Sequence, residues 1–82
     1  MPTKPSPRSA NDIDNHLGSR LRERRKELGL SQVSVGEATG VTFQQIQKYE
    51  LGTNRIAASR LYLLAKTLEV PLDYFFEGVD DG

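Results

Sequence analysis

The sequence predicts an all-α fold, with five short helices packed into one compact domain over residues 12–78. Apolar residues recur at every third or fourth position through most of this range, which is the period of a helix with one buried face. Glycine, serine, threonine or proline stands where one periodic segment ends and the next begins, as at helix ends. The connections between the segments are short, as is usual in a small domain, and no segment is predicted as a strand.

The first helix is predicted from about Asp12 or Ile13 to Leu28. Asn11 or Asp12 can cap it by accepting hydrogen bonds from its free N–H groups, and Gly29 ends it. Its apolar stripe consists of Ile13, Leu17, Leu21 and Leu28. Residues 1–11 contain three prolines and no apolar periodicity, so we expect a disordered N-terminal arm there.

The second and third helices are predicted to lie on either side of a tight turn at Gly40, where a glycine adopts positive φ without strain. Ser31 caps the second helix and Thr42 caps the third, which runs to Leu51. Gly36 stands inside the second helix, where glycine is unfavourable. We therefore expect its missing side chain to let the next helix approach closely.

The fourth helix is predicted over about 58–68, and its buried stripe consists of Leu61, Leu64, Ala65 and Leu68. Pro71 suits the start of a helix, so a short fifth helix is predicted over about 72–76. In the third helix, Ile46 and Tyr49 are predicted to face the core. Residues 79–82 form an acidic tail.

Composition excludes several classes of function. A chain of 82 residues without cysteine has no disulfide framework and no thiolate metal site. His16 is the only histidine, has no carboxylates at ligand spacing, and is expected to be an exposed helix residue. No phosphate-binding loop and no paired acids beside an apolar pocket are present, so no enzyme activity, cofactor or small-molecule ligand is expected. No membrane span or signal peptide is predicted, and we expect a cytoplasmic protein.

Charge is unevenly distributed although the formal net charge is zero. Residues 1–66 hold all eleven Lys and Arg and six acids, a balance of +5, whereas residues 67–82 hold five acids and no base. A neutral chain of this kind can still present a basic face to nucleic acid.

The segment from residue 30 to residue 56, LSQVSVGEATGVTFQQIQKYELGTNRI, resembles the Cro/phage-repressor type of helix-turn-helix domain of the XRE-like regulators. The resemblance covers about residues 13–77 and implies a lambda-repressor-like domain. The positions that carry it are Leu30-Ser31-Gln32, Gly36, Gly40-Val41-Thr42, Ile46, Tyr49-Glu50 and Gly52. Gly36 is small, as the pattern requires, but Gly36 and Thr39 replace the more common Ala and Leu. Phe43 stands where a polar residue is more usual, and Ile56 where a proline is common.

The resemblance implies that the third helix lies in the major groove of double-stranded DNA and reads base edges with its first residues. The residues at the reading positions are Phe43, Gln44, Gln45 and Lys48. Glutamine can pair with adenine, lysine can donate to guanine, and a phenyl edge can contact a thymine methyl. Two alternatives remain open: the glutamines form only a solvated face, or Phe43 packs on the second helix.

The resemblance also implies contacts that position the domain on DNA. Gln32, Thr42 and Arg55 correspond to phosphate contacts, which add affinity without reading sequence. Arg25 and Glu50 correspond to an ion pair that ties the first helix to the third. The alternative for this pair is that both side chains are exposed and contribute little.

Members of this family usually bind palindromic sites as dimers, and the apolar residues of the fifth helix are the candidates for a dimer contact: Leu72, Tyr74, Phe75 and Phe76. These residues can instead close the small core. The predicted function is therefore a DNA-binding transcriptional regulator, as a dimeric repressor. The alternative is a protein-interaction module, such as an antitoxin or an anti-repressor partner, on the same fold.

Overall fold

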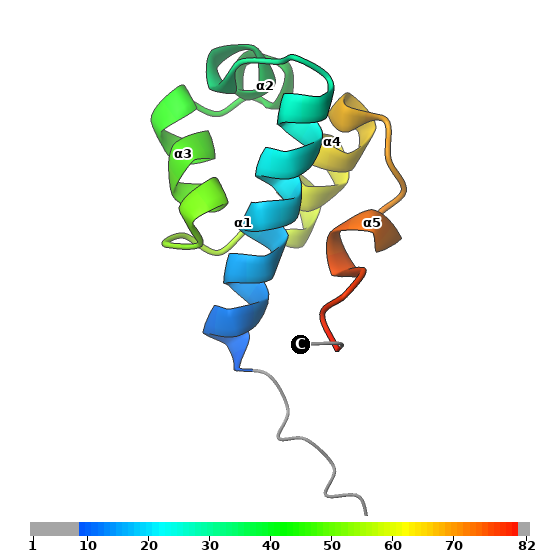
Figure 1. Cartoon of the computed structure of the whole chain (residues 1–82). Coiled ribbons are helices and arrows are strands. Elements are labelled where there is room, and N and C mark those ends of the chain that lie inside the picture. Colours follow the sequence, from blue (N-terminus) through cyan, green and yellow to red (C-terminus); the bar gives the residue numbers. More distant parts are fainter. Residues whose placement is uncertain (1–8, 81–82) are drawn as a thin grey trace, which may run out of the picture.

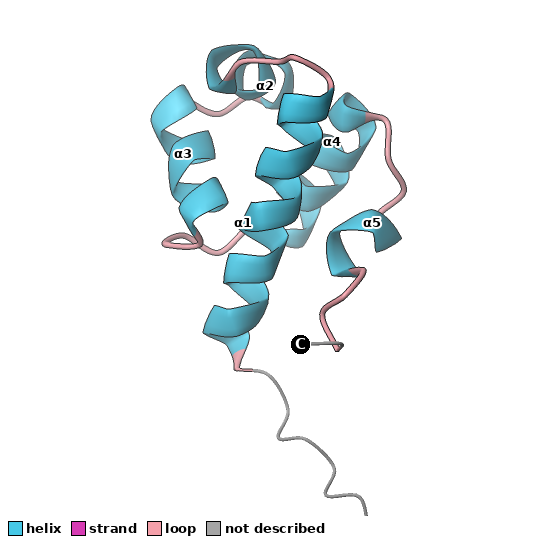
Figure 2. Ribbon diagram, in the orientation of Figure 1, coloured by secondary structure: helices cyan, strands magenta, loops and turns pink. Residues whose placement is uncertain are grey.

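Five α-helices form the computed structural model of the chain, which describes residues 9–80 (Figures 1 and 2). The helices are α1 (Ala10–Glu27), α2 (Gln32–Thr39), α3 (Phe43–Leu51), α4 (Ala58–Leu68) and α5 (Asp73–Phe76). Between residues 9 and 80 there is no strand, so the predicted all-α class is confirmed. Most of the predicted N-terminal arm and the end of the acidic tail lie outside the described residues.

The longest helix, α1, organises the packing of the others. It packs against α3, α5 and α4, while α2 packs against α3 and α4. In Figure 1, α1 runs through the middle of the view, α2 crosses above it, and α3 and α5 lie on opposite sides. The pair α2 and α3 is therefore held by α1 through α3 and by α4 through α2.

The helix ends follow from local sequence, with one correction. The Ser31 and Thr42 side chains accept from the N–H groups of Ser34 and Gln45, at 3.0 Å and 3.2 Å. Gly40 adopts φ of 77° between α2 and α3, as predicted. The predicted start of α1 is wrong by two or three residues, because Ser9 rather than Asn11 or Asp12 is its N-cap.

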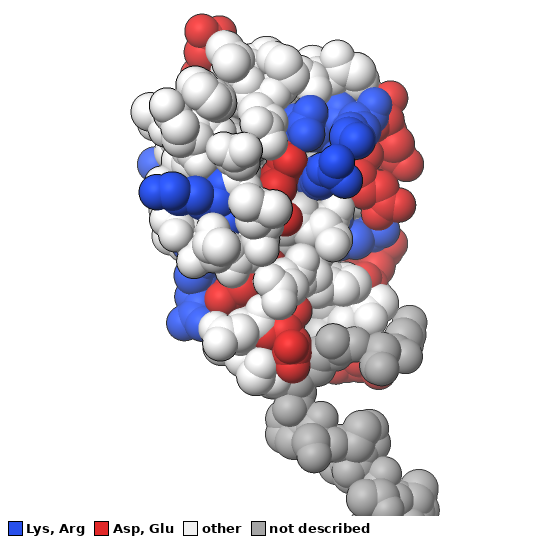
Figure 3. All heavy atoms as spheres, turned by 60° about the vertical axis from the view of Figure 1, so that its left-hand side comes forward, with Lys and Arg blue, Asp and Glu red and all other residues white. Residues whose placement is uncertain are grey.

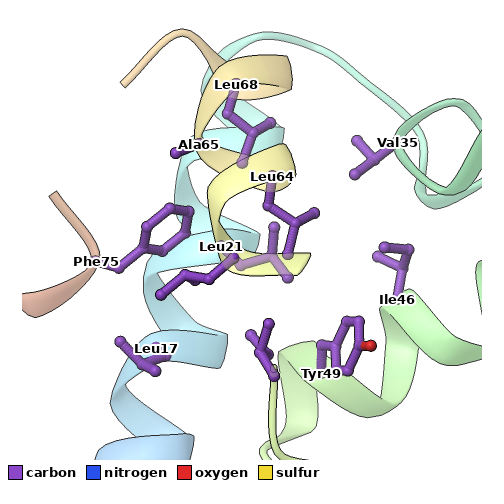
Figure 4. Close-up of a cluster of buried hydrophobic side chains, with 11 residues drawn as sticks. Leu17, Leu21, Val35, Ile46, Tyr49, Leu64, Ala65, Leu68 and Phe75 are labelled. Carbon is purple, nitrogen blue, oxygen red and sulfur yellow. The ribbon is translucent and has the colours of Figure 1, made fainter. Parts of the chain in front are cut away.

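The core receives side chains from all five helices (Figure 4). Leu21, Val35, Ile46, Leu64, Leu68 and Phe75 are fully buried. The predicted stripe of α4 and the predicted inward residues of α3 are all in this core. Phe75 extends from α5 into the core. It covers the side of α1 opposite to α3.

Two glycines allow close approach of neighbouring segments. A Cβ atom at Gly36 would lie 2.5 Å from the Val41 carbonyl oxygen, which explains the glycine inside α2. Gly18 plays the same part in α1, where a Cβ atom would lie 2.7 Å from the Glu50 carbonyl oxygen of α3. Both close approaches involve backbone, so the α1–α3 and α2–α3 spacings leave no room for a side chain at these positions.

Candidate nucleic-acid interface

The helix α3 has one buried face and one face open to solvent. Its buried residues are Ile46, Tyr49 and Glu50, which lie on one arc of a helix with 3.6 residues per turn. The opposite arc carries exposed residues: Phe43, Gln44, Gln47, Lys48 and Leu51, with Gln45 partly exposed. This exposed arc is long enough to meet another molecule along two turns of helix.

All four predicted base-reading side chains reach solvent from this arc or its edge. Phe43 is 45% exposed, so the second helix does not bury it. Gln44 and Lys48 are one turn apart and share a face. Gln45 and Lys48 use backbone groups in their bonds to Thr42 and Thr53, and within residues 9–80 the side chains of Gln44, Gln45 and Lys48 form no hydrogen bond.

The predicted ion pair between Arg25 and Glu50 is present in the structure. Arg25 Nε donates to Glu50 Oε2 at 2.6 Å and Arg25 Nη2 donates to Glu50 Oε1 at 3.0 Å. The two side chains are only 11% and 3% exposed, so this is a bidentate pair shielded from water. The hydrogen bond to Glu50 raises the pKa of Arg25 above its ordinary value. The pair joins α1 to the end of α3 beneath its exposed face.

Gln32 belongs to the same group of side chains. Its Nε2 donates to Glu50 Oε1 at 3.1 Å, so the carboxylate bridges the start of α2, the end of α3 and α1. Sequence reasoning assigned Gln32 to a phosphate contact and missed this bond. The bond engages one amide donor, and the contact of Gln32 with a phosphate stays a prediction.

The two other predicted phosphate residues stand at opposite ends of α3. Thr42 is exposed, and its oxygen accepts the cap bond while its hydroxyl hydrogen can still donate outward. Arg55 Nε donates to Asp14 Oδ2 at 3.0 Å, and the Arg55 side chain stays 63% exposed. Asp14 was not predicted, and it orients the Arg55 guanidinium from the first turns of α1.

Further polar contacts hold the helices that support α3, and no local pattern in the sequence predicts them. An Nη1 hydrogen bond from Arg60 of α4 to the Thr39 carbonyl oxygen braces the turn between α2 and α3. Arg24 donates to the Leu68 carbonyl oxygen at 2.9 Å, at the end of α4. His16 is half-buried and lies 2.6 Å from the Glu77 carbonyl oxygen, so its prediction as an exposed helix residue is wrong.

The predicted dimer residues divide into two groups. Phe75 is fully buried in the core, so its assignment to a dimer contact is wrong. Tyr74 is half-buried beneath the Arg20 guanidinium, which lies 3.8 Å from the ring centroid. Leu72 and Phe76 are 39% and 46% exposed and remain open to a partner. A four-residue helix turns only once, so consecutive residues point to the core and to solvent.

Figure 3 shows the face that includes α3. Lys and Arg side chains gather at the sides of this face, and Asp and Glu atoms lie between them, at its lower end and along its right-hand edge. Two capped helices, a left-handed glycine between them and an exposed polar arc on the second helix define a helix-turn-helix domain.

The chain belongs to the helix-turn-helix family, in the Cro/phage-repressor (XRE-like) type, because the family model described as Helix-turn-helix matches residues 21–75. This family comprises DNA-binding transcriptional regulators rather than enzymes. No helix within residues 9–80 is long and apolar enough to cross a membrane.

Named relatives agree with this family. An HTH-type transcriptional regulator of Sinorhizobium medicae is 60% identical over 67 residues, which cover 82% of this chain and 48% of the relative. A transcriptional regulator from the ATPase CF(0) region of Rhodospirillum rubrum is 53% identical over 75 residues, covering 92% of this chain and 69% of the relative. The chain spans about half the length of several of the curated relatives that it matches.

Solved structures share the fold. The restriction-modification controller protein C.AhdI from Aeromonas hydrophila aligns with a TM-score of 0.74 and 27% identity, over 77% of this chain and 96% of that chain. The P22 c2 repressor, solved in complex with a synthetic operator, aligns with a TM-score of 0.70 and 32% identity, over 76% of this chain and 94% of that chain.

Proposed function

We propose that this domain binds double-stranded DNA with α3 in the major groove and reads base edges with Gln44, Gln45 and Lys48. The observation that carries the proposal is the state of these side chains: they project from a fixed helix, reach solvent and have no hydrogen-bonding partner within residues 9–80. The amide of glutamine matches the donor and acceptor of adenine, and the lysine ammonium can donate to guanine O6 and N7.

The support beneath α3 favours this role. Base recognition requires donors and acceptors that are held in position before binding, because ordering them on the DNA would cost affinity. The bidentate Arg25–Glu50 pair and the glycine contact at Gly18 fix the end of α3 on α1. Phe43, at the first exposed position, offers a ring edge suited to a thymine methyl.

We further propose that the protein acts as a homodimeric repressor on a palindromic operator. One recognition helix contacts too few base pairs for useful specificity, and two copies would read half-sites about 10 base pairs apart. The exposed side chains of Leu72 and Phe76 support a contact between copies through α5. Similarity to the P22 c2 repressor supports operator binding. A regulator of bacterial promoters would act in the cytoplasm.

Selection of bound duplexes from a random DNA pool tests the proposal. We expect enrichment of one motif, repeated as an inverted half-site with about one helical turn between centres. The double variant Gln44→Ala/Gln45→Ala should recover a less restricted motif, whereas Arg55→Ala should recover the same motif at lower affinity. If the wild-type protein enriches no sequence, the proposal fails and the protein-interaction module becomes the better explanation of the fold.

A further inference from the structure

A hollow lies beside α3 on the flank that faces α1 and the start of α2. Arg22, Gln32 and Gln47 stand among the residues that line it. A second hollow adjoins it along α1 and is lined by Arg22, Glu23 and Lys26, among others. Arg22, on α1, therefore lines both hollows. It lies next to the exposed arc of α3.

The electrostatic balance of this flank is positive, because it carries Arg22, Arg25 and Lys26 against two acids, Glu23 and Glu50, and Glu23 pairs with Arg20. Arg25 also lines the first hollow, but its charge is matched by Glu50. Arg22 and Lys26 are exposed, and neither forms a salt bridge with any residue between 9 and 80. By contrast, Arg20, Arg24, Arg25 and Arg55 each pair with a carboxylate in that range. The two cations on this flank are therefore available to an external anion.

The dimensions of DNA determine which anion reaches this flank. A helix with its side chains is about 10–12 Å across, and the major groove is about 12 Å wide. A helix seated in the groove therefore has a sugar–phosphate strand along each of its two flanks. With Gln44 and Lys48 directed at the bases, one strand runs past Gln47 and over the hollow that contains Arg22.

We propose that Arg22 binds a backbone phosphate of the DNA strand that lies on the α1 side of α3, with Lys26 as the second cation along the same strand. The inference rests on the proposed function. The planar guanidinium of Arg22 can donate two parallel hydrogen bonds to a phosphate, and nothing within residues 9–80 competes for it. This contact comes from α1, a helix to which the sequence analysis assigned no DNA contact.

The test uses the duplex that selection from a random pool enriches for the wild-type protein, and measures its affinity by fluorescence anisotropy between about 50 and 200 mM NaCl. Each phosphate contact adds about 0.9 to the slope of log K against log salt. We expect Arg22→Gln to make the slope shallower by about 0.9 per protomer, with the same preferred sequence and an unchanged melting temperature.

Two variants serve as controls. Lys66→Gln removes the same charge from α4, lines neither hollow, and should leave the slope unchanged. Arg22→Lys keeps the charge and should keep the slope. If Arg22→Gln retains the wild-type slope, or if Lys66→Gln reduces it equally, the Arg22 contact is wrong. If selection enriches no duplex for the wild-type protein, the proposed function itself fails.

Discussion

Replacing Arg25 with alanine should destabilise the fold more than any other loss of a charged side chain on α1. The substitution removes both hydrogen bonds to Glu50 and the 2.9 Å bond from Arg25 Nη1 to the Leu30 carbonyl oxygen. The Glu50 carboxylate, which is 3% exposed in the intact structure, then keeps Gln32 as its one side-chain partner within residues 9–80. A buried charge left in this way costs about 3–5 kcal/mol.

That cost is large for a domain of this size, whose total stability is about 5–15 kcal/mol. At about 4–8 °C for each kcal/mol, a loss of about 3 kcal/mol lowers the melting temperature by roughly 12–24 °C. Helical circular dichroism followed through urea and thermal unfolding measures both quantities. Adding Glu50→Gln to Arg25→Ala removes the stranded charge and should recover part of the loss.

The matched control is Arg22→Ala, three residues away on the same helix. Arg22 is exposed and forms no salt bridge with the described residues, so its loss should change stability by less than about 0.5 kcal/mol. Equal unfolding midpoints for Arg25→Ala and Arg22→Ala would refute the assignment of the pair as a support for α3.

Three further outcomes test other parts of the structure. Gly18→Ala should destabilise by about 1–3 kcal/mol in urea unfolding because the new methyl group meets α3 backbone, whereas Ser19→Ala on the exposed side of α1 should be nearly neutral. Burial raises the pKa of Tyr74 above 10.0. Because the folded state favours the neutral phenol, Tyr74 contributes fully to the free energy of unfolding below the ordinary tyrosine pKa. This contribution is lost as the pH rises through the raised pKa. Tyr74→Phe should therefore remove the decrease in stability at alkaline pH from a curve of stability against pH. Phe76→Glu should shift a dimer to monomer in sedimentation experiments without lowering the melting temperature of the monomer, since this side chain is 46% exposed; an unchanged dimer would exclude α5 as the interface.

The features predicted correctly from the sequence depend on neighbouring residues. A serine or threonine cap bonds to an N–H three residues along the chain, and a left-handed glycine ends its own helix. The stripe of α4 follows from a period that any helix imposes. The ion pair between Arg25 and Glu50 needed the family resemblance, because the two residues are 25 positions apart.

The features that were missed are of two kinds. Some are contacts between residues far apart in the sequence, and others depend on which of two adjacent side chains is buried. Arg55 and Asp14 are 41 positions apart, and His16 and Glu77 are 61 positions apart, so no local pattern joins them. Phe75 and Phe76 are adjacent and equally apolar, and one turn of helix gives no period that could assign one to the core. That assignment required the position of α5 against α1.

The second half of α1 carries five cations, and the tertiary structure determines which of them stay free. They are Arg20, Arg22, Arg24, Arg25 and Lys26. Three of the four arginines, at positions 20, 24 and 25, reach α5, the end of α4 and α3, where they meet backbone carbonyl oxygens and carboxylates. The acidic end of the chain contributes to this, because Glu77 pairs with Arg20 at 2.8 Å. Of the five cations between residues 20 and 26, three are therefore engaged within the domain. The segment uses three of its cations to assemble the domain around α3 and leaves Arg22 and Lys26 on the flank where a phosphate strand would pass in the proposed complex.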